Sequence, residues 1–130
     1  MQDKIIMSVG QCMPDHYSIA RLVNELGLKI EKVDYPEQAL ELLKKNKNQY
    51  ALVLVNRKID IDYSDGLELI KKIKSHPEIK DIPVMLVSNF PEAQEEAVKN
   101  GALYGFGKAE LSKTETKEKI LNALNIKAFY

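Results

Sequence analysis

Short apolar runs alternate with amphipathic segments along the whole chain, and this alternation occurs five times. The apolar runs cover residues 5–9, 28–33, 51–55, 82–87 and 103–107. The first, third and fourth runs are apolar almost without interruption, which is typical of parallel strands covered by helices on both faces. The second run mostly alternates apolar and polar residues, as a half-exposed edge strand does. The pattern therefore predicts five strands, with the second at one edge and the short, glycine-containing last run at the other.

The segments between these runs have the period of amphipathic helices. The first helical stripe ends at Gly27, a favourable left-handed helix end. Pro36 and Pro91 suit the first turns of the second and fourth helices. Before the last helix, Ser112 and Glu115 have the spacing of a capping box, which predicts Ser112 as its N-cap.

Strands that alternate with helices through a whole chain imply an α/β fold. With the second run at an edge, we predict a doubly wound, five-stranded parallel sheet of order 2-1-3-4-5, a flavodoxin-like three-layer α/β/α architecture. One domain is expected over residues 1–130, with a core of about 4–124 and a C-terminal tail of 125–130. In such a sheet the functional crevice lies at the carboxyl ends of the strands, where the strand order reverses.

Composition narrows the function classes. Apolar residues make up 45% and charged residues 29%, and 19 basic side chains balance 19 acidic ones. This balance gives no electrostatic reason to expect binding to nucleic acid or to an anionic membrane. The single cysteine, Cys12, excludes an internal disulfide and favours a reducing, cytoplasmic location. No apolar run approaches the roughly 20 residues that a membrane-spanning helix needs.

Several motifs in order resemble the receiver domains of response regulators in two-component signalling. Residues 52–56 followed by 65–70 resemble the third-strand region of that family, and residues 82–88 resemble its fourth strand. Residues 100–102 with Lys108 resemble its fifth-strand signature. The similarity covers nearly the whole chain. It implies a receiver fold and a phosphate-accepting pocket at the crevice.

The resemblance also shows where this chain departs from the family. Family members hold Mg²⁺ with two acids after the first strand and a phosphoacceptor aspartate ending the third. A hydroxyl residue and a lysine contact the phosphoryl group. The corresponding positions form a degenerate pocket here: Gly10, Gln11, Asn56, Ser88 and Lys108. A one-residue shift would place Gln11 and Cys12 at the acid pair, and neither alignment supplies a carboxylate.

Loss of the acids has direct chemical consequences. The amide of Asn56 is neutral and a poor nucleophile, and Mg²⁺ is usually held by one or two carboxylates. We therefore predict no aspartyl phosphorylation, no Mg²⁺ binding, no other cofactor and no enzymatic activity. The loop after Asn56 is also about two residues longer than the family pattern. Ala109 replaces the usual proline, and Gly105 takes the position of the aromatic switch residue.

Two alternatives remain open. Asp60, Asp62 and Asp65 lie in the long loop and could allow a divergent receiver to be switched by phosphorylation or a metal through shifted acids. A calcium loop that starts at Asp60 is disfavoured, because Lys71 would occupy the position of the bidentate glutamate. A small flavodoxin-like binding protein or enzyme is the other alternative, although no glycine-rich phosphate loop supports it.

The remaining route to function is through a surface. In the family, the face formed by the fourth helix, fifth strand and fifth helix commonly makes dimer or partner contacts. The residues expected there, unless they serve the core instead, are Ala93, Ala97, Tyr104, Phe106 and Leu121. We expect a non-catalytic interaction module that binds a signalling protein, a fused or associated effector, or a second copy of itself.

Overall fold

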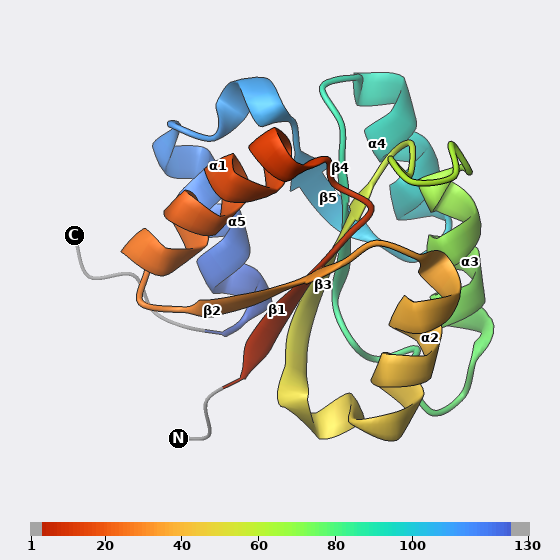
Figure 1. The fold of residues 1–130 in the computed structure, drawn as a ribbon. Helices are drawn as coiled ribbons and strands as arrows, with labels where there is room; N and C mark the ends of the chain where they lie inside the picture. The colour runs from red at the N-terminus through yellow and green to blue at the C-terminus, as the bar shows by residue number, and fades with distance from the viewer. Residues whose placement is uncertain (1–3, 126–130) are drawn as a thin grey trace.

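The protein is described by a computed structural model over residues 4–125. Within this range a parallel sheet has the strand order β2-β1-β3-β4-β5 (Figure 1). The strands are β1 (Ile5–Val9), β2 (Lys29–Val33), β3 (Tyr50–Asn56), β4 (Val84–Val87) and β5 (Leu103–Phe106). The predicted fold class, strand order and edge strands are confirmed. All but the first residue of the expected tail 125–130 lies outside the described residues.

Helices cover both faces of the sheet (Figure 1). Packed on one face are α1 (Met13–Glu25) and α5 (Thr114–Ala123), and on the other α2 (Pro36–Lys45), α3 (Gly66–Ser75) and α4 (Pro91–Lys99). Short 3-10 turns occur at Lys47–Gln49 and Lys108–Glu110. In residues 4–125 no helix combines the length and apolar character needed to cross a membrane.

The core has two layers because successive side chains of a strand point to opposite faces. Val53 and Val55 of β3 are fully buried against the α2–α3–α4 layer, whereas Leu52 and Leu54 are fully buried against α1 and α5. Burying each such side chain contributes about 1.5–3 kcal/mol. The nearly continuous apolar character of β3 follows from this two-sided burial.

Glycines mark two special backbone positions. Gly27 has a φ of +76° just after α1, which confirms the predicted left-handed helix end. A Cβ at Gly105 would lie 2.2 Å from the carbonyl oxygen of Leu86. The backbones of β4 and β5 therefore approach each other closely at this glycine.

The predicted N-cap of the last helix is wrong. Lys113, not Ser112, is the N-cap of α5, and its side chain makes no capping hydrogen bond. The preceding turn is fixed differently, because a Glu110 carboxylate oxygen accepts from the Gly107 N–H at 2.9 Å. The hydroxyl of Thr116 then donates to the Glu110 carbonyl at 2.6 Å. These bonds delay the helix start to Thr114.

Candidate functional site

Asn56 ends β3 at the carboxyl edge of the sheet, where the phosphoacceptor was expected. Its side-chain Nδ2 donates to the Gly10 carbonyl at 3.0 Å and to the Lys58 carbonyl at 2.7 Å. Carbonyl oxygens only accept hydrogen bonds, so the chemistry of the two partners fixes the orientation of the amide. A carboxylate in this position would bring an acceptor oxygen against two other acceptors. Asn56 therefore ties the loop after β1 to the loop after β3.

Gly10 lies directly after β1 with a φ of +77°. A Cβ added there would be 2.5 Å from Cδ1 of Ile59 and 3.1 Å from its Cα. Ile59 is fully buried, so the space beside Gly10 is filled by an apolar side chain from the long loop. The Gly10 carbonyl also accepts from the Asp60 N–H at 2.9 Å. A side chain at the first acid position would therefore need Ile59 to shift and would have to adopt a left-handed backbone conformation.

The loop between β3 and α3 folds back on itself to bury Ile59. The Ile59 N–H donates to the Ser64 carbonyl at 2.9 Å, and the Tyr63 N–H donates to the Ile59 carbonyl at 2.8 Å. An isolated antiparallel bridge joins Lys58 to Asp65 at the base of the loop. The longer loop that the sequence shows is therefore a closed turn that presses one isoleucine into the pocket.

Two of the three acids of this loop, Asp62 and Asp65, are occupied by local contacts. One Asp62 carboxylate oxygen accepts from both the N–H and the hydroxyl of Ser64, which lowers the pKa of Asp62. Asp65 is the N-cap of α3 and accepts from the Leu67 N–H at 2.9 Å. These bonds do not favour the alternative of a switch through shifted acids.

The pocket lacks the donor set that Mg²⁺ takes. Gln11, at the second acid position, is 1% exposed, and neither polar atom of its amide has a hydrogen-bond partner among the described residues. Across residues 4–125, no three His, Cys, Asp or Glu side chains group closely enough to hold a metal ion. Because the pocket offers amides and carbonyls where Mg²⁺ needs carboxylates, the residues present do not fit the ion that the family binds.

Ser88 and Lys108, the two matching positions, are engaged elsewhere. The Ser88 hydroxyl oxygen accepts from the Phe90 N–H at 3.1 Å. The Lys108 Nζ lies 2.6 Å from a carboxylate oxygen of Asp15, in the first turn of α1. The hydrogen bond from Lys108 lowers the pKa of Asp15. A cavity of about 220 Å³ brings Asn56, Ser88 and Lys108 together, whereas Gly10 and Gln11 are not among its lining residues.

Asp15 was missed by the sequence analysis. A first-turn acid usually favours the helix N-terminus, and nothing in its spacing connects it to Lys108. The one available signal is its place about one helical turn after the expected acid pair. The pocket lysine thus meets a carboxylate from α1 and not from the end of β3.

Gln94 was also missed, and it joins α4 to two strands. Its 2%-exposed amide donates to the Leu86 carbonyl at 2.9 Å and to the Ser88 carbonyl at 3.2 Å. The same amide accepts from the Gly105 N–H at 2.8 Å. Nearby, the Ala109 N–H donates to Asn89 at 3.1 Å, a bond that a proline in that position could not make. The two departures from the family pattern in this region, Gly105 and Ala109, each donate a backbone hydrogen bond to a side chain.

The predicted partner face needs correction. Ala97, Phe106 and Leu121 are 0%, 1% and 7% exposed and belong to the core, because their places on α4, β5 and α5 point them toward the sheet or its covering helices. Ala93 is half-buried. Tyr104 is 47% exposed, with the Lys119 ammonium 5.1 Å from its ring centroid. Of the five, Tyr104 is the one exposed side chain.

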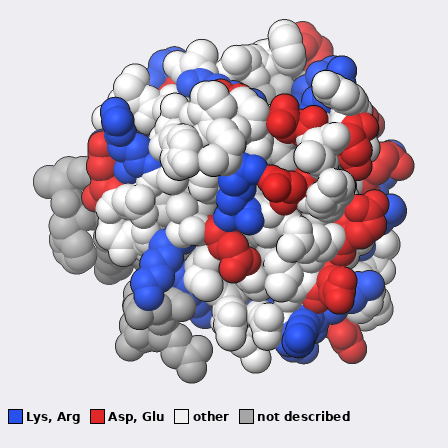
Figure 2. All heavy atoms as spheres, viewed as in Figure 1, with Lys and Arg blue, Asp and Glu red and all other residues white. Residues whose placement is uncertain are grey.

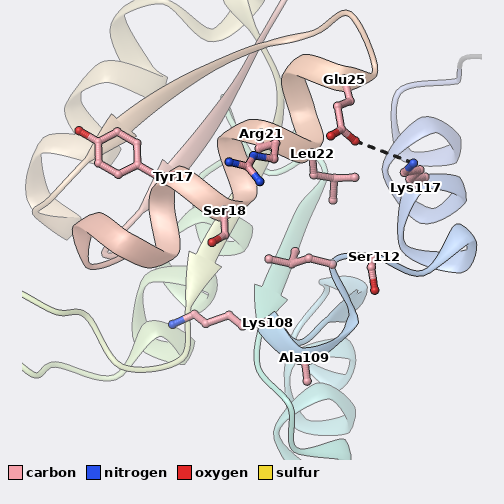
Figure 3. A pocket seen from close by; sticks show the side chains of 10 residues that line it. Tyr17, Ser18, Arg21, Leu22, Glu25, Lys108, Ala109, Ser112 and Lys117 are labelled. Carbon is pink, nitrogen blue, oxygen red and sulfur yellow. Dashed lines mark ion pairs between the residues drawn. The ribbon is translucent and has the colours of Figure 1, made fainter.

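A larger groove of about 590 Å³ runs between α1 and the segment that leads into α5 (Figure 3). Its lining is polar and includes Ser18, Arg21 and Lys117. Lys117 pairs with Glu25 across the groove at 4.0 Å. Lys108 lines one end, so this groove adjoins the smaller pocket around Asn56.

Comparison with known proteins identifies the class of this fold and site. The model of the response regulator receiver domain matches residues 16–125. The two-component response regulator ORR3 of Oryza sativa subsp. indica is 28% identical over 103 residues, 75% of this chain and 73% of that protein. ARR3 of Arabidopsis thaliana is 30% identical over 91 residues, 65% of this chain and 39% of that protein. The chain belongs to the response regulator receiver domain family, whose members work with other signalling proteins.

Solved structures agree on the fold. A response regulator from Chloroflexus aurantiacus is 17% identical, with a TM-score of 0.75 over 95% of this chain and 99% of that one. One from Burkholderia pseudomallei, 20% identical with a TM-score of 0.69 over 94% of this chain and 66% of that one, was solved with a phosphorylated aspartic acid. The family match begins at His16, after both acid positions, Gly10 and Gln11.

Proposed function

We propose that this receiver domain does not accept a phosphoryl group and acts by binding another protein. The observation that carries the proposal is the bonding of Asn56, whose amide nitrogen donates to the carbonyls of Gly10 and Lys58. The residue at the nucleophile position serves as a hydrogen-bond donor inside the domain. An amide is also too weak a nucleophile for attack on phosphorus.

The absence of a suitable metal site supports the same proposal. Mg²⁺ neutralises the charge that develops on a transferring phosphoryl group. Here Ile59 packs where the first acid would project, and Gln11 replaces the second. Asp15 is already paired with Lys108. Phosphoryl transfer would have to proceed without a nucleophile, a metal or a free lysine, so we propose that the domain is not an enzyme.

The β4–β5 side supports a binding surface that does not depend on phosphorylation. Gln94 holds α4 to β4 and β5 through three hydrogen bonds, and Gly105 leaves no aromatic side chain to change rotamer. Leu103 and Tyr104, 44% and 47% exposed, present apolar area on β5 beside this fixed helix. We place the partner contact on this face. A signalling protein, an effector or a second copy could occupy it, and the single free cysteine suits a cytoplasmic location.

The labelling test uses acetyl phosphate with Mg²⁺ followed by intact mass spectrometry. A receiver domain that has the full acid set is treated in parallel and must gain one phosphoryl group. This chain is expected to stay unmodified. A stoichiometric phosphoryl adduct on it would overturn the proposal.

The binding test compares two tyrosines of equal exposure. Tyr104 and Tyr35 are each 47% exposed, so alanine substitutions remove similar surface from different places. Tyr104→Ala is expected to reduce recovery of a bound protein from extracts of the source cells, while Tyr35→Ala leaves it unchanged. Equal recovery of the bound protein with both variants would show that Tyr104 does not take part in the proposed partner contact.

A further inference from the structure

A groove of about 550 Å³ lies between the start of α3 and α4. Its apolar lining comes from α3, β4, α4 and the N-cap of α4, and consists of Leu67, Leu86, Phe90 and Ala93. Leu86 is almost fully buried at 2% exposure, whereas Phe90 is 58% exposed. Tyr104 is not among the lining residues, so this groove is separate from the β5 face. The Phe90 ring is therefore exposed at the edge of a concave apolar surface.

The rim of the groove is acidic. Asp65, Glu92 and Glu96 line it, and Arg57 is the cation among its described lining residues. The Arg57 guanidinium lies 5.6 Å from the centroid of the Phe90 ring, so it rests on the apolar wall. Figure 2 shows acidic side chains gathered on the side of the molecule that carries α3 and α4. The groove thus combines an apolar interior with net negative charge.

Two of these acids repel each other within the folded domain. Glu92 and Glu96 are both exposed on α4 and four residues apart, so they lie on the same face of the helix, one turn apart. Among the described residues, neither carboxylate has an ion pair, whereas the neighbouring Glu68 pairs with Lys71 at 3.3 Å. Like charges at this spacing destabilise a helix. A cation supplied from outside would remove that repulsion.

We propose that this groove binds a segment of a partner protein that carries an apolar side chain next to lysine or arginine. The apolar side chain would pack against Phe90 and Ala93, removing exposed apolar area from water. The basic side chain would lie beside Glu92 and Glu96. An acidic segment is disfavoured because its charge repels this rim. The inference rests on the proposed function only in treating the domain as a protein-binding module.

The test pans a library of random 12-residue displayed peptides against the intact chain. Recovered peptides are expected to combine an apolar or aromatic residue with lysine or arginine. Synthetic copies then report Kd by fluorescence anisotropy against the wild type, Glu96→Lys and Glu95→Lys. Glu95 is an exposed neighbour on α4 that does not line the groove, so the control makes the same charge change. We expect Glu96→Lys to weaken binding about tenfold or more, as reversal of a contacting charge does, and Glu95→Lys to change it less than about twofold.

Circular dichroism establishes that both variants remain folded, as expected for exposed helix positions. The proposal is overturned if no peptide is recovered, if the recovered peptides lack basic residues, or if both variants weaken binding equally. It is also overturned if Tyr104→Ala alone removes binding, or if light scattering shows that Glu96→Lys dissociates a homodimer, since a second copy would then be the occupant. A phosphoryl adduct in the labelling test would refute the proposed function but would not bear on peptide binding in this groove.

Discussion

The two sides of the pocket differ in how they depart from the receiver pattern. On the β1–β3 side the residue types themselves have changed, and Ile59 fills the space next to Gly10. On the β4–β5 side Ser88 and Lys108 keep the family's residue types but bond to Phe90 and Asp15. One side is rebuilt as core, while the other keeps its polar groups in a new arrangement. A retained residue therefore does not imply a retained role, because the partners of that residue have changed.

The largest effect is expected for Ile59→Ala on the rebuilt side. Removing this fully buried side chain should lower the free energy of unfolding by about 2–5 kcal/mol, through lost burial and a residual cavity. Ile61→Ala is the control, because Ile61 is 48% exposed in the same loop and should change stability by less than about 0.5 kcal/mol. Urea denaturation measures both. Similar losses for the two variants would mean that Ile59 does not seal the pocket.

Gly10→Ala tests whether the first acid position can hold any side chain. The left-handed backbone costs a non-glycine residue about 1–2 kcal/mol, and the contact with Ile59 should add about 1–3 kcal/mol. Gly27→Ala isolates the first cost, since Gly27 has nearly the same φ but open space around it. The free energy of unfolding should fall further for Gly10→Ala than for Gly27→Ala. Equal losses of the free energy of unfolding would show that the contact with Ile59 adds no steric cost at position 10.

On the β4–β5 side, Gln94→Ala should lower the free energy of unfolding by about 1–3 kcal/mol, because it leaves buried backbone groups unpaired. The amide proton of Gly105, which donates to Gln94, should also exchange faster with solvent. Glu95→Ala, an exposed change on the same helix, serves as the control. Unchanged exchange at Gly105 would show that Gln94 does not fix α4 to the sheet.

The smallest effect is expected from Asp15→Asn. The Asp15 and Lys108 side chains are 35% and 30% exposed, so solvent screening should limit the loss of stability to less than about 1 kcal/mol at pH 7. Lys108 lowers the pKa of Asp15 in the folded state. The stability that Asp15 contributes is therefore present above its unfolded pKa of about 3.9 and is lost as the pH falls through the lowered folded value. Denaturation of both proteins from pH 7 to pH 3 should show the difference shrinking below about pH 4; a difference that grows with acidification would contradict the pairing.

The sheet could be predicted from sequence because its signals are local and repeated. A strand such as 51–55 is apolar throughout only when helices cover both faces, and Gly27 marks a helix end by its own conformational freedom. Motif spacing then predicts that Asn56, Ser88 and Lys108 lie at one edge of the sheet. These inferences needed no knowledge of which side chains touch.

The contacts that define the pocket could not be predicted in the same way. Ile59 and Ile61 are equivalent in sequence, yet one is fully buried and the other 48% exposed, because the fold of the loop decides which points inward. The pairing of Asp15 with Lys108 joins residues far apart in the chain. For Phe106 and Leu121 the sequence leaves both the partner face and the core open, and both residues lie in the core. The period of a short strand or helix does not specify its register against its neighbours.

The most direct test of the account is phosphodonor labelling of the Asn56→Asp variant. The variant restores the family's nucleophile but leaves Ile59 beside Gly10, the neutral Gln11 and the Asp15–Lys108 pair in place. Its new carboxylate would also face the carbonyls of Gly10 and Lys58. After incubation with acetyl phosphate and Mg²⁺, with folding checked by circular dichroism, intact mass should show no phosphoryl adduct. A stoichiometric adduct on Asp at this one position would contradict the claim that the pocket has been rebuilt.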